Sequence, residues 1–263
     1  MIELAAYGAI GAATGFFAGL LGIGGGLIMV SSLALIYAAQ GFPAAYIMHL
    51  AIGTSLAAIM AGAWASFRTH HRHGSVDWPT VKAMSPGLLA GVLLGSLAAR
   101  FLPTSFLKVF FLGFMAFVTF QMVFNVRPRA ARALPGRAAL GGVGLLIGVA
   151  SSWFGGGAAA VGVPFLTWCS MSMHRAIGTV AAMGFPLAIA GATGYVLAGL
   201  TVDGLPRWSV GFVYLPALVG ISITSLAVAP YGARLAHRLK GATLKRIFAA
   251  FLIAVGIKIA VSV

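Results

Sequence analysis

The sequence predicts an all-α integral membrane protein made of two inverted repeats, each a glycine-broken re-entrant helix hairpin followed by three transmembrane helices. Three observations lead to this fold class: the composition, the length of the apolar stretches, and a set of motifs that occurs twice. Of the 263 residues, 60% are hydrophobic and only 8% are charged, whereas soluble domains carry about 25% charged residues. So few charges could not cover a soluble surface, and the chain is therefore expected to span a membrane several times.

Most of the chain divides into apolar stretches of the length that a membrane-spanning helix requires, about 20 residues. The clear candidates are roughly 44–67, 84–102, 105–124, 175–199, 208–230 and 245–262. Two further apolar stretches, about 4–38 and about 138–170, are too long for one simple helix. Glycine clusters interrupt both of them, at Gly22 to Gly26 and at Gly155 to Gly157.

The same short motifs return in the same order in the second half of the chain. The first copy is His49-Leu50-Ala51-Ile52-Gly53-Thr54, and the second copy is His174-Arg175-Ala176-Ile177-Gly178-Thr179. A glycine cluster precedes each copy, and a Val-Asp pair follows each, Val76-Asp77 and Val202-Asp203. Duplicated apolar halves with matching breaks are typical of secondary transporters. The predicted organisation is a first membrane repeat over 1–125, a basic cytoplasmic linker over 126–137 and a second membrane repeat over 138–263.

The distribution of basic residues distinguishes two topologies, because cytoplasmic loops carry an excess of Lys and Arg. If each long stretch crosses once, the 17 basic residues divide almost evenly between the two sides. If each long stretch folds back at its glycines, all but Arg100, Lys108, Arg207 and Lys258 lie on one side. We favour the second topology, which places both termini on the non-cytoplasmic side and brings the two glycine clusters together near the midplane. Two broken single crossings remain the alternative.

The glycine clusters are the predicted substrate site. Irregular backbone at membrane depth must lie against protein or line a cavity, and a helix that begins after such a break directs its free N–H groups and positive dipole end there. The natural ligand is an anion. The candidate binding residues are these glycines and the hydroxyl residues of the repeated motif: Gly24, Gly25, Gly26, Thr54, Ser55, Gly155, Gly156, Gly157 and Thr179. The hydroxyls could instead form hydrogen bonds within their own helix. The glycines could instead serve close helix packing, as we expect for the ladder of Gly11, Gly15 and Gly19.

The repeated histidines and the neighbouring arginine are candidates for gating or proton coupling. His49 and His174 titrate near neutral pH, but a helix-start histidine bonded to backbone is the simpler interpretation. Arg175 could attract an anion to the cytoplasmic mouth or act only as a topology signal. Asp77 and Asp203 are interpreted as turn or helix-cap residues. No metal site and no cofactor are expected, since His70, His71 and His73 lie among arginines.

The chain resembles the TauE/SafE family, also called the sulfite exporter or TSUP family. The resemblance rests on the spaced glycines from Gly8 through Gly26, on Ala51-Ile52-Gly53-Thr54-Ser55 with its echo at Ala176-Ile177-Gly178-Thr179, and on Gly232-Ala233-Arg234-Leu235-Ala236-His237-Arg238-Leu239. It covers essentially the whole chain. The resemblance implies transport of sulfite, sulfoacetate or related organosulfur anions across the bacterial cytoplasmic membrane.

Together these observations predict a secondary transporter, and more specifically an exporter, of a small sulfur oxyanion or organosulfonate in the bacterial inner membrane. The alternatives are an anion channel with the same glycine-lined filter and a non-transporting membrane subunit. An enzyme is not expected, because no carboxylate lies within a span. Besides the substrate, the expected partners are anionic membrane lipids, which the net charge of +14 would attract. Nucleic acid is not an expected partner, and the sequence leaves the oligomeric state open, a homo-oligomer included.

Overall fold

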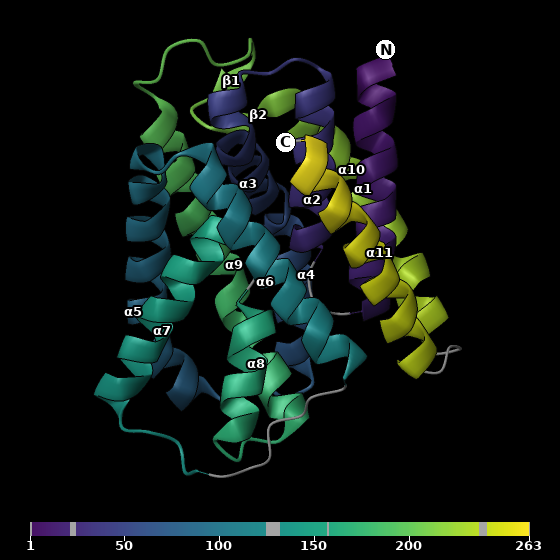
Figure 1. Cartoon of the computed structure of the whole chain (residues 1–263). Helices are drawn as coiled ribbons and strands as arrows, with labels where there is room; N and C mark the ends of the chain where they lie inside the picture. Colours follow the sequence, from purple (N-terminus) through teal and green to yellow (C-terminus); the bar gives the residue numbers. More distant parts are fainter. Residues whose placement is uncertain (1, 22–24, 125–131, 157, 237–240, 263) are drawn as a thin grey trace.

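A computed structural model describes residues 2–21, 25–124, 132–156, 158–236 and 241–262 of the chain. Most of these residues are helical (Figure 1). The helices are α1 (Ile2–Leu21), α2 (Gly26–Ala39), α3 (Ile47–Ala58), α4 (Met60–Arg72), α5 (Trp78–Ala98), α6 (Thr104–Val123), α7 (Arg137–Phe154), α8 (Ala159–Trp168), α9 (Met173–Gly199), α10 (Leu215–Ala236) and α11 (Gly241–Ser262). Two single-turn 3₁₀ segments, η1 (Ala44–Tyr46) and η2 (Ala99–Phe101), complete the helical structure of the described residues.

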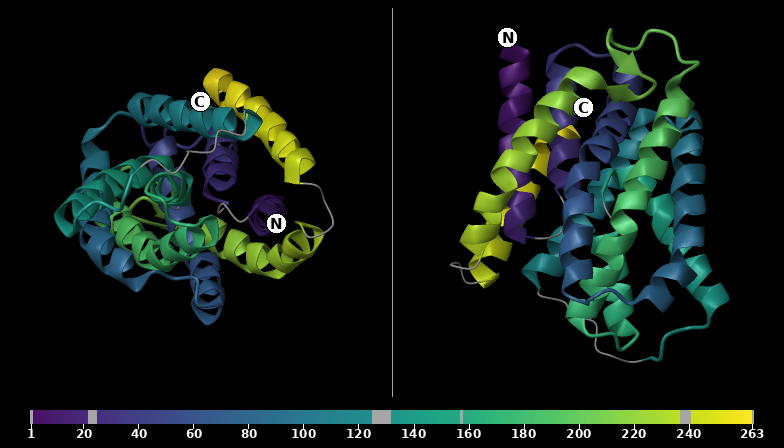
Figure 2. Two further views of the ribbon diagram at one scale, coloured as in Figure 1. Left: turned by 90° about the horizontal axis from the view of Figure 1, so that it is seen from below. Right: turned by 180° about the vertical axis from the view of Figure 1, so that it is seen from behind.

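The predicted class, an all-α integral membrane protein, is confirmed. Within the described residues, five helical segments are long and apolar enough to cross a membrane: Ala44–Arg72, Trp78–Phe101, Thr104–Val123, Arg137–Phe154 and Met173–Gly199. All but Arg137–Phe154, which leads from one end into the interior, pass between the two ends of the molecule. The first turn of α1 and the last turn of α11 lie toward the same end (Figures 1 and 2).

Both overlong apolar stretches are divided into two helices at their glycine clusters. Helix α1 leads from the end that carries the N-terminal turn toward the interior, and α2 returns toward the same end (Figure 1). Helix α7 enters from the opposite end and α8 returns there. The chain therefore reverses its direction at each glycine cluster instead of continuing as one long helix.

Each half of the chain packs a helix against a helix of the other half. Helix α1 of the first half packs along α10 of the second half, and α7 of the second half packs along α5 of the first half. Glycines make both contacts close: a Cβ atom on Gly15 would lie 2.3 Å from the carbonyl oxygen of Ser225, and one on Gly148 would lie 2.2 Å from that of Leu88. The expected packing role of the glycine ladder in α1 is thus confirmed at Gly15, and Gly11 meets Ile221 in the same way.

The helices differ from the predicted spans at several of their ends, and α10 and α11 extend to Ala236 and from Gly241 where residues 230 and 245 were predicted. Helix α5 begins at Trp78 instead of residue 84, because Asp77 caps it there. The span predicted for 208–230 begins only at Leu215, since an antiparallel hairpin of β1 (Ser209–Val210) and β2 (Val213–Tyr214) precedes it. The first span continues to Arg72 and is interrupted at Ile59, where α3 gives way to α4.

Candidate functional site

The glycine segments of the two halves lie in backbone contact. A Cβ atom on Gly26 would lie 2.6 Å from the carbonyl oxygen of Gly155 and 2.7 Å from Cα of Gly156. Any larger residue at position 26 would push these segments apart. Gly25 is buried beside Gly26, whereas Gly24 and Gly157 lie outside the described residues.

A short helix begins directly after each glycine segment. Helix α2 begins at Gly26 and α8 begins at Ala159, and they lead away from the interior toward opposite ends of the molecule (Figure 1). The first N–H groups of a helix have no intrahelical acceptor, and the N-terminus carries about half a positive charge. Two positive helix ends are therefore directed into the interior of the molecule from opposite sides.

Ser55 joins α3 to the glycine segment of the other half. Gly155 ends α7 in the left-handed conformation, with φ of 65°, and packs against Val30 and Ile52. The Ser55 hydroxyl donates a hydrogen bond of 3.0 Å to the carbonyl oxygen of Gly155. Because the Gly155 carbonyl oxygen already accepts this hydrogen bond, its negative charge is compensated within the protein.

The repeated Gly-Thr pairs hold the segments that enter α10 and α5. Thr54 accepts a hydrogen bond of 3.0 Å from the backbone N–H of Tyr214, and Thr179 accepts one of 3.0 Å from that of Asp77. The neighbouring glycines allow the close approach: a Cβ on Gly53 would lie 2.5 Å from the Phe212 carbonyl oxygen, and Gly178 meets Ser75 similarly. Both contacts join one half of the chain to the other.

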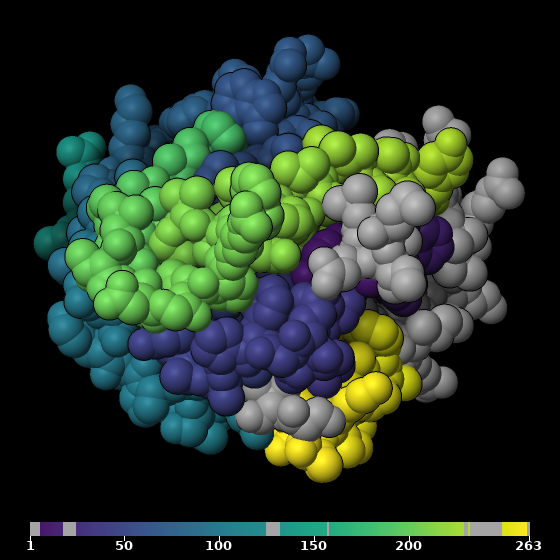
Figure 3. Space-filling model, turned by 90° about the horizontal axis from the view of Figure 1, so that it is seen from above, coloured from purple at the N-terminus to yellow at the C-terminus, as the bar shows by residue number. Residues whose placement is uncertain are grey.

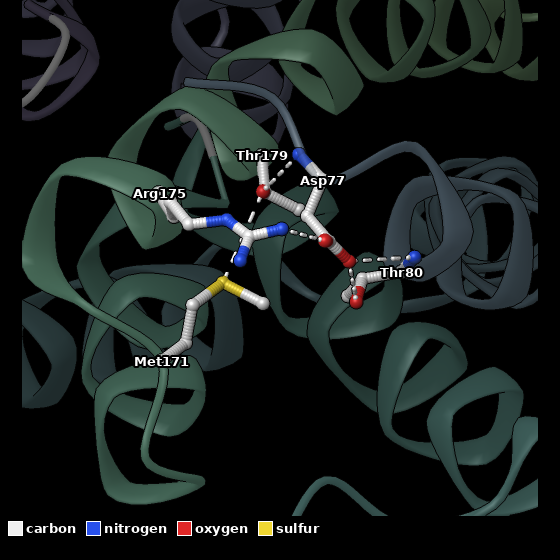
Figure 4. A network of polar contacts seen from close by, with 5 residues as sticks. All are labelled: Asp77, Thr80, Met171, Arg175 and Thr179. Atoms are coloured by element: carbon white, nitrogen blue, oxygen red, sulfur yellow. Dashed lines mark hydrogen bonds and ion pairs between the residues drawn. The ribbon is translucent and has the colours of Figure 1, made fainter. Parts of the chain in front are cut away.

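Asp77 forms a polar network that connects α5 with α9. Its carboxylate accepts hydrogen bonds from the backbone N–H and the hydroxyl of Thr80, which caps α5 as predicted, and it pairs with the guanidinium of Arg175 (Figure 4). Thr179 contacts both the N–H of Asp77 and the sulfur of Met171. Sequence reasoning placed Arg175 at a mouth of the protein but missed its partner on the other half.

The two repeated histidines differ in their surroundings. His49 is buried, and its Nε2 lies 2.9 Å from the carbonyl oxygen of Ala99 and 3.1 Å from that of Leu102. The backbone-bonded interpretation therefore describes His49. His174 is exposed near the start of α9.

Buried aromatic side chains close the end of the molecule that carries the β-hairpin. Tyr37 stacks on Phe42 with ring centroids 4.7 Å apart, and Tyr214 meets both rings edge to face. Tyr7 of α1 also meets Tyr214 edge to face. From above, the loop before α3 and the segment between α9 and α10 lie side by side and cover this face (Figure 3).

The sequence contained a signal for the Tyr214 contact. Asp77-Trp78-Pro79 and Tyr214-Leu215-Pro216 each begin a helix with proline at its second position, 137 residues apart. Sequence reasoning instead paired Asp77 with Asp203 through the repeated Val-Asp. Asp203 is not the structural counterpart of Asp77, because it lies in a turn well before α10 and not at the start of that helix.

The fold and the paired broken helices define the class as a multi-pass membrane transporter. The family model described as sulfite exporter TauE/SafE matches residues 7–259, and the chain belongs to this family. A probable membrane transporter protein of Haemophilus influenzae is 34% identical over 251 residues, 94% of each chain. Probable membrane transporter proteins of Xylella fastidiosa (30% identical, 94% of this chain and 91% of the relative) and Bacillus subtilis, YdhB (22%, 88% and 89%), also match. No solved structure matches this chain significantly.

Proposed function

We propose that this protein is a secondary transporter that exports a small sulfur-containing anion, sulfite or an organosulfonate, across the bacterial inner membrane. The observation that carries the proposal is the backbone contact of Gly26 with Gly155 and Gly156, from which the N-termini of α2 and α8 both depart. The substrate binds there to backbone N–H groups. The predicted glycines, Thr54, Ser55 and Thr179 form or support this site.

Transport by alternating access requires two bodies that can move against each other around a fixed site. The exchanged packing of α1 with α10 and of α5 with α7 supports an inverted-repeat relation between the halves. One body contains α1 and α10, and the other contains α5 and α7. The Thr54 and Thr179 contacts lie at corresponding positions of the two halves, and each joins one half to the other.

The membrane potential alone can drive export. In the described part of the chain, Arg72 ends α4, Arg137 begins α7 and Arg175 lies in the first turn of α9, all toward the end of the molecule opposite the β-hairpin, and we assign that end to the cytoplasm. An inside-negative potential of 100 mV favours the outward movement of one negative charge by about 2.3 kcal/mol. The mechanism therefore needs no coupled ion, and the buried, backbone-bonded His49 has no role as a proton carrier in it.

The proposal is tested by counterflow in proteoliposomes loaded with unlabelled sulfite and diluted into radiolabelled sulfite. A transporter transiently accumulates the label, whereas a channel only equilibrates it and a non-transporting subunit moves none. Gly26→Ala should abolish the accumulation because its Cβ would meet Gly155. Gly113→Ala is the control, since a Cβ there meets nothing within 4 Å. Equal accumulation in both variants would exclude the glycine contact as the site.

A further inference from the structure

The last turn of α7 contains a buried hydroxyl that has no hydrogen-bond partner among the described residues. The side chain of Ser151 is 0% exposed, and its Oγ forms no hydrogen bond with the described part of the chain. This is unusual, because serine and threonine in membrane helices normally donate to a carbonyl of the preceding turn. Ser31 donates to the carbonyl of Leu27 and Ser152 donates to that of Val149, at 2.7 and 2.6 Å.

Ser151 lies one helical turn from the contact between the glycine segments. Its carbonyl accepts the N–H of Gly155 at 3.1 Å, so Ser151 and Gly155 share a face of α7. On that face Gly155 meets Gly26, Val30 and Ile52 of the first half. The free hydroxyl is therefore next to the place toward which the N-termini of α2 and α8 are directed.

A buried hydroxyl without a partner lowers stability, and functional sites are among the places where such groups are retained. We propose that Ser151 donates a hydrogen bond to the transported anion and is the side-chain ligand of a site otherwise built from backbone N–H groups. This inference rests on the proposed function and assigns it a specific donor. A hydroxyl offers one directional hydrogen bond to an oxyanion oxygen, and chloride, which is a single spherical acceptor, gains less from it.

The test measures sulfite affinity by thermal shift of the purified full-length protein, with sodium chloride replacing sulfite at equal ionic strength as the reference. Ser151→Ala should raise the Kd for sulfite about tenfold or more, the usual worth of a hydrogen bond to a charged group. Ser151→Cys, which keeps the volume and donates weakly, should fall between Ser151→Ala and the wild type. The unliganded Tm should not fall in Ser151→Ala, because no existing hydrogen bond is lost.

Thr14 provides the matched control. Its hydroxyl is also buried without a partner in the described structure, but it lies on α1 more than two turns before Gly25. Thr14→Val should leave the Kd for sulfite unchanged. A wild-type Kd in Ser151→Ala, or an equal loss in Thr14→Val, overturns the role of Ser151 and leaves the proposed function standing. A wild-type protein that sulfite does not stabilise overturns both.

Discussion

The hydroxyl of Thr179 on α9 accepts a hydrogen bond from the backbone N–H of Asp77, the residue that caps α5 of the other half. Thr54 on α3 accepts the corresponding bond from Tyr214, directly before α10. Each repeated Gly-Thr pair thus fixes the start of a helix that belongs to the opposite half. These contacts add a structural role to two residues that we also propose to be part of the substrate site.

Replacing either threonine by valine should destabilise the protein. The exchange keeps the shape of the side chain but leaves the N–H of Tyr214 or Asp77 without its acceptor, which costs about 1–3 kcal/mol when the group is buried. Thr54 is fully buried, so Thr54→Val should lower the Tm in detergent, whereas Thr54→Ser should largely retain it. Equal Tm values for Val and Ser would show that the hydrogen bond does not contribute.

The glycines beside these threonines should not tolerate even alanine. A Cβ on Gly53 would lie 2.5 Å from the backbone oxygen of Phe212, and one on Gly178 would lie 2.6 Å from that of Ser75. We expect Gly53→Ala and Gly178→Ala to lower the Tm, since backbone must move. Gly62→Ala on α4 meets nothing within 4 Å and should be neutral or stabilising by up to about 1 kcal/mol. An equal decrease in Tm in all three variants would indicate that these helices require glycine for a reason other than close packing.

The two members of the Asp77–Arg175 ion pair should contribute unequally. The side chain of Arg175 is 59% exposed, and exposed ion pairs typically contribute less than about 1 kcal/mol. Asp77→Ala should lower the stability by about 1 kcal/mol more than the loss of the ion pair alone, because it also removes the cap of α5. Asp77→Asn should recover most of that difference. Thermal unfolding of Arg175→Gln, Asp77→Ala and Asp77→Asn gives the order of their stabilities. A larger loss of stability in Arg175→Gln than in Asp77→Ala would contradict the prediction.

The one cysteine should react slowly with maleimide in the folded protein. Cys169 is 3% exposed, and burial raises the pKa of its thiol, an effect that Arg132 opposes only in part. A raised pKa means less reactive thiolate at neutral pH, so labelling should be slow there and accelerate as the pH rises. Labelling after unfolding in SDS measures the maximum extent of maleimide modification, to which the native protein is compared. Fast labelling of the native protein would contradict the buried position.

The proposed site should select singly charged anions. The described side chains at the glycine contact include those of Val30, Ile52, Ser55 and Phe154, all of them uncharged. Neutral donors compensate the desolvation of a dianion poorly. Methanesulfonate should therefore stabilise the protein and sulfate should not. Stabilisation by sulfite should increase as falling pH converts it to hydrogensulfite, whereas that by methanesulfonate should not change. A preference for sulfate would argue against a site without cations.

Local sequence patterns predicted the elements better than their contacts. The length of the apolar stretches and the glycine clusters indicated where α1–α2 and α7–α8 would divide, and Asp77 before Trp78-Pro79 indicated the cap of α5. The β-hairpin before α10 was missed, since Val210, Phe212 and Val213 are as apolar as the helix that follows. The partners of Thr54 and Thr179, each more than 100 residues away, were missed because the sequence motifs were matched as Asp77 with Asp203 and not as Asp77 with Tyr214.

The exchange of partners between the halves also constrains how the chain can be assembled. Helix α1 leaves the ribosome about 200 residues before α10, the helix that its Gly11 and Gly15 face contacts. During synthesis that face has only lipid or other early helices as neighbours. A chain truncated after α9 would retain an intact α5–α7 contact but leave α1 permanently without its partner. We therefore expect that the first half is not completed before the second, and that the N-terminal helix reaches its final position only after α10 has been inserted.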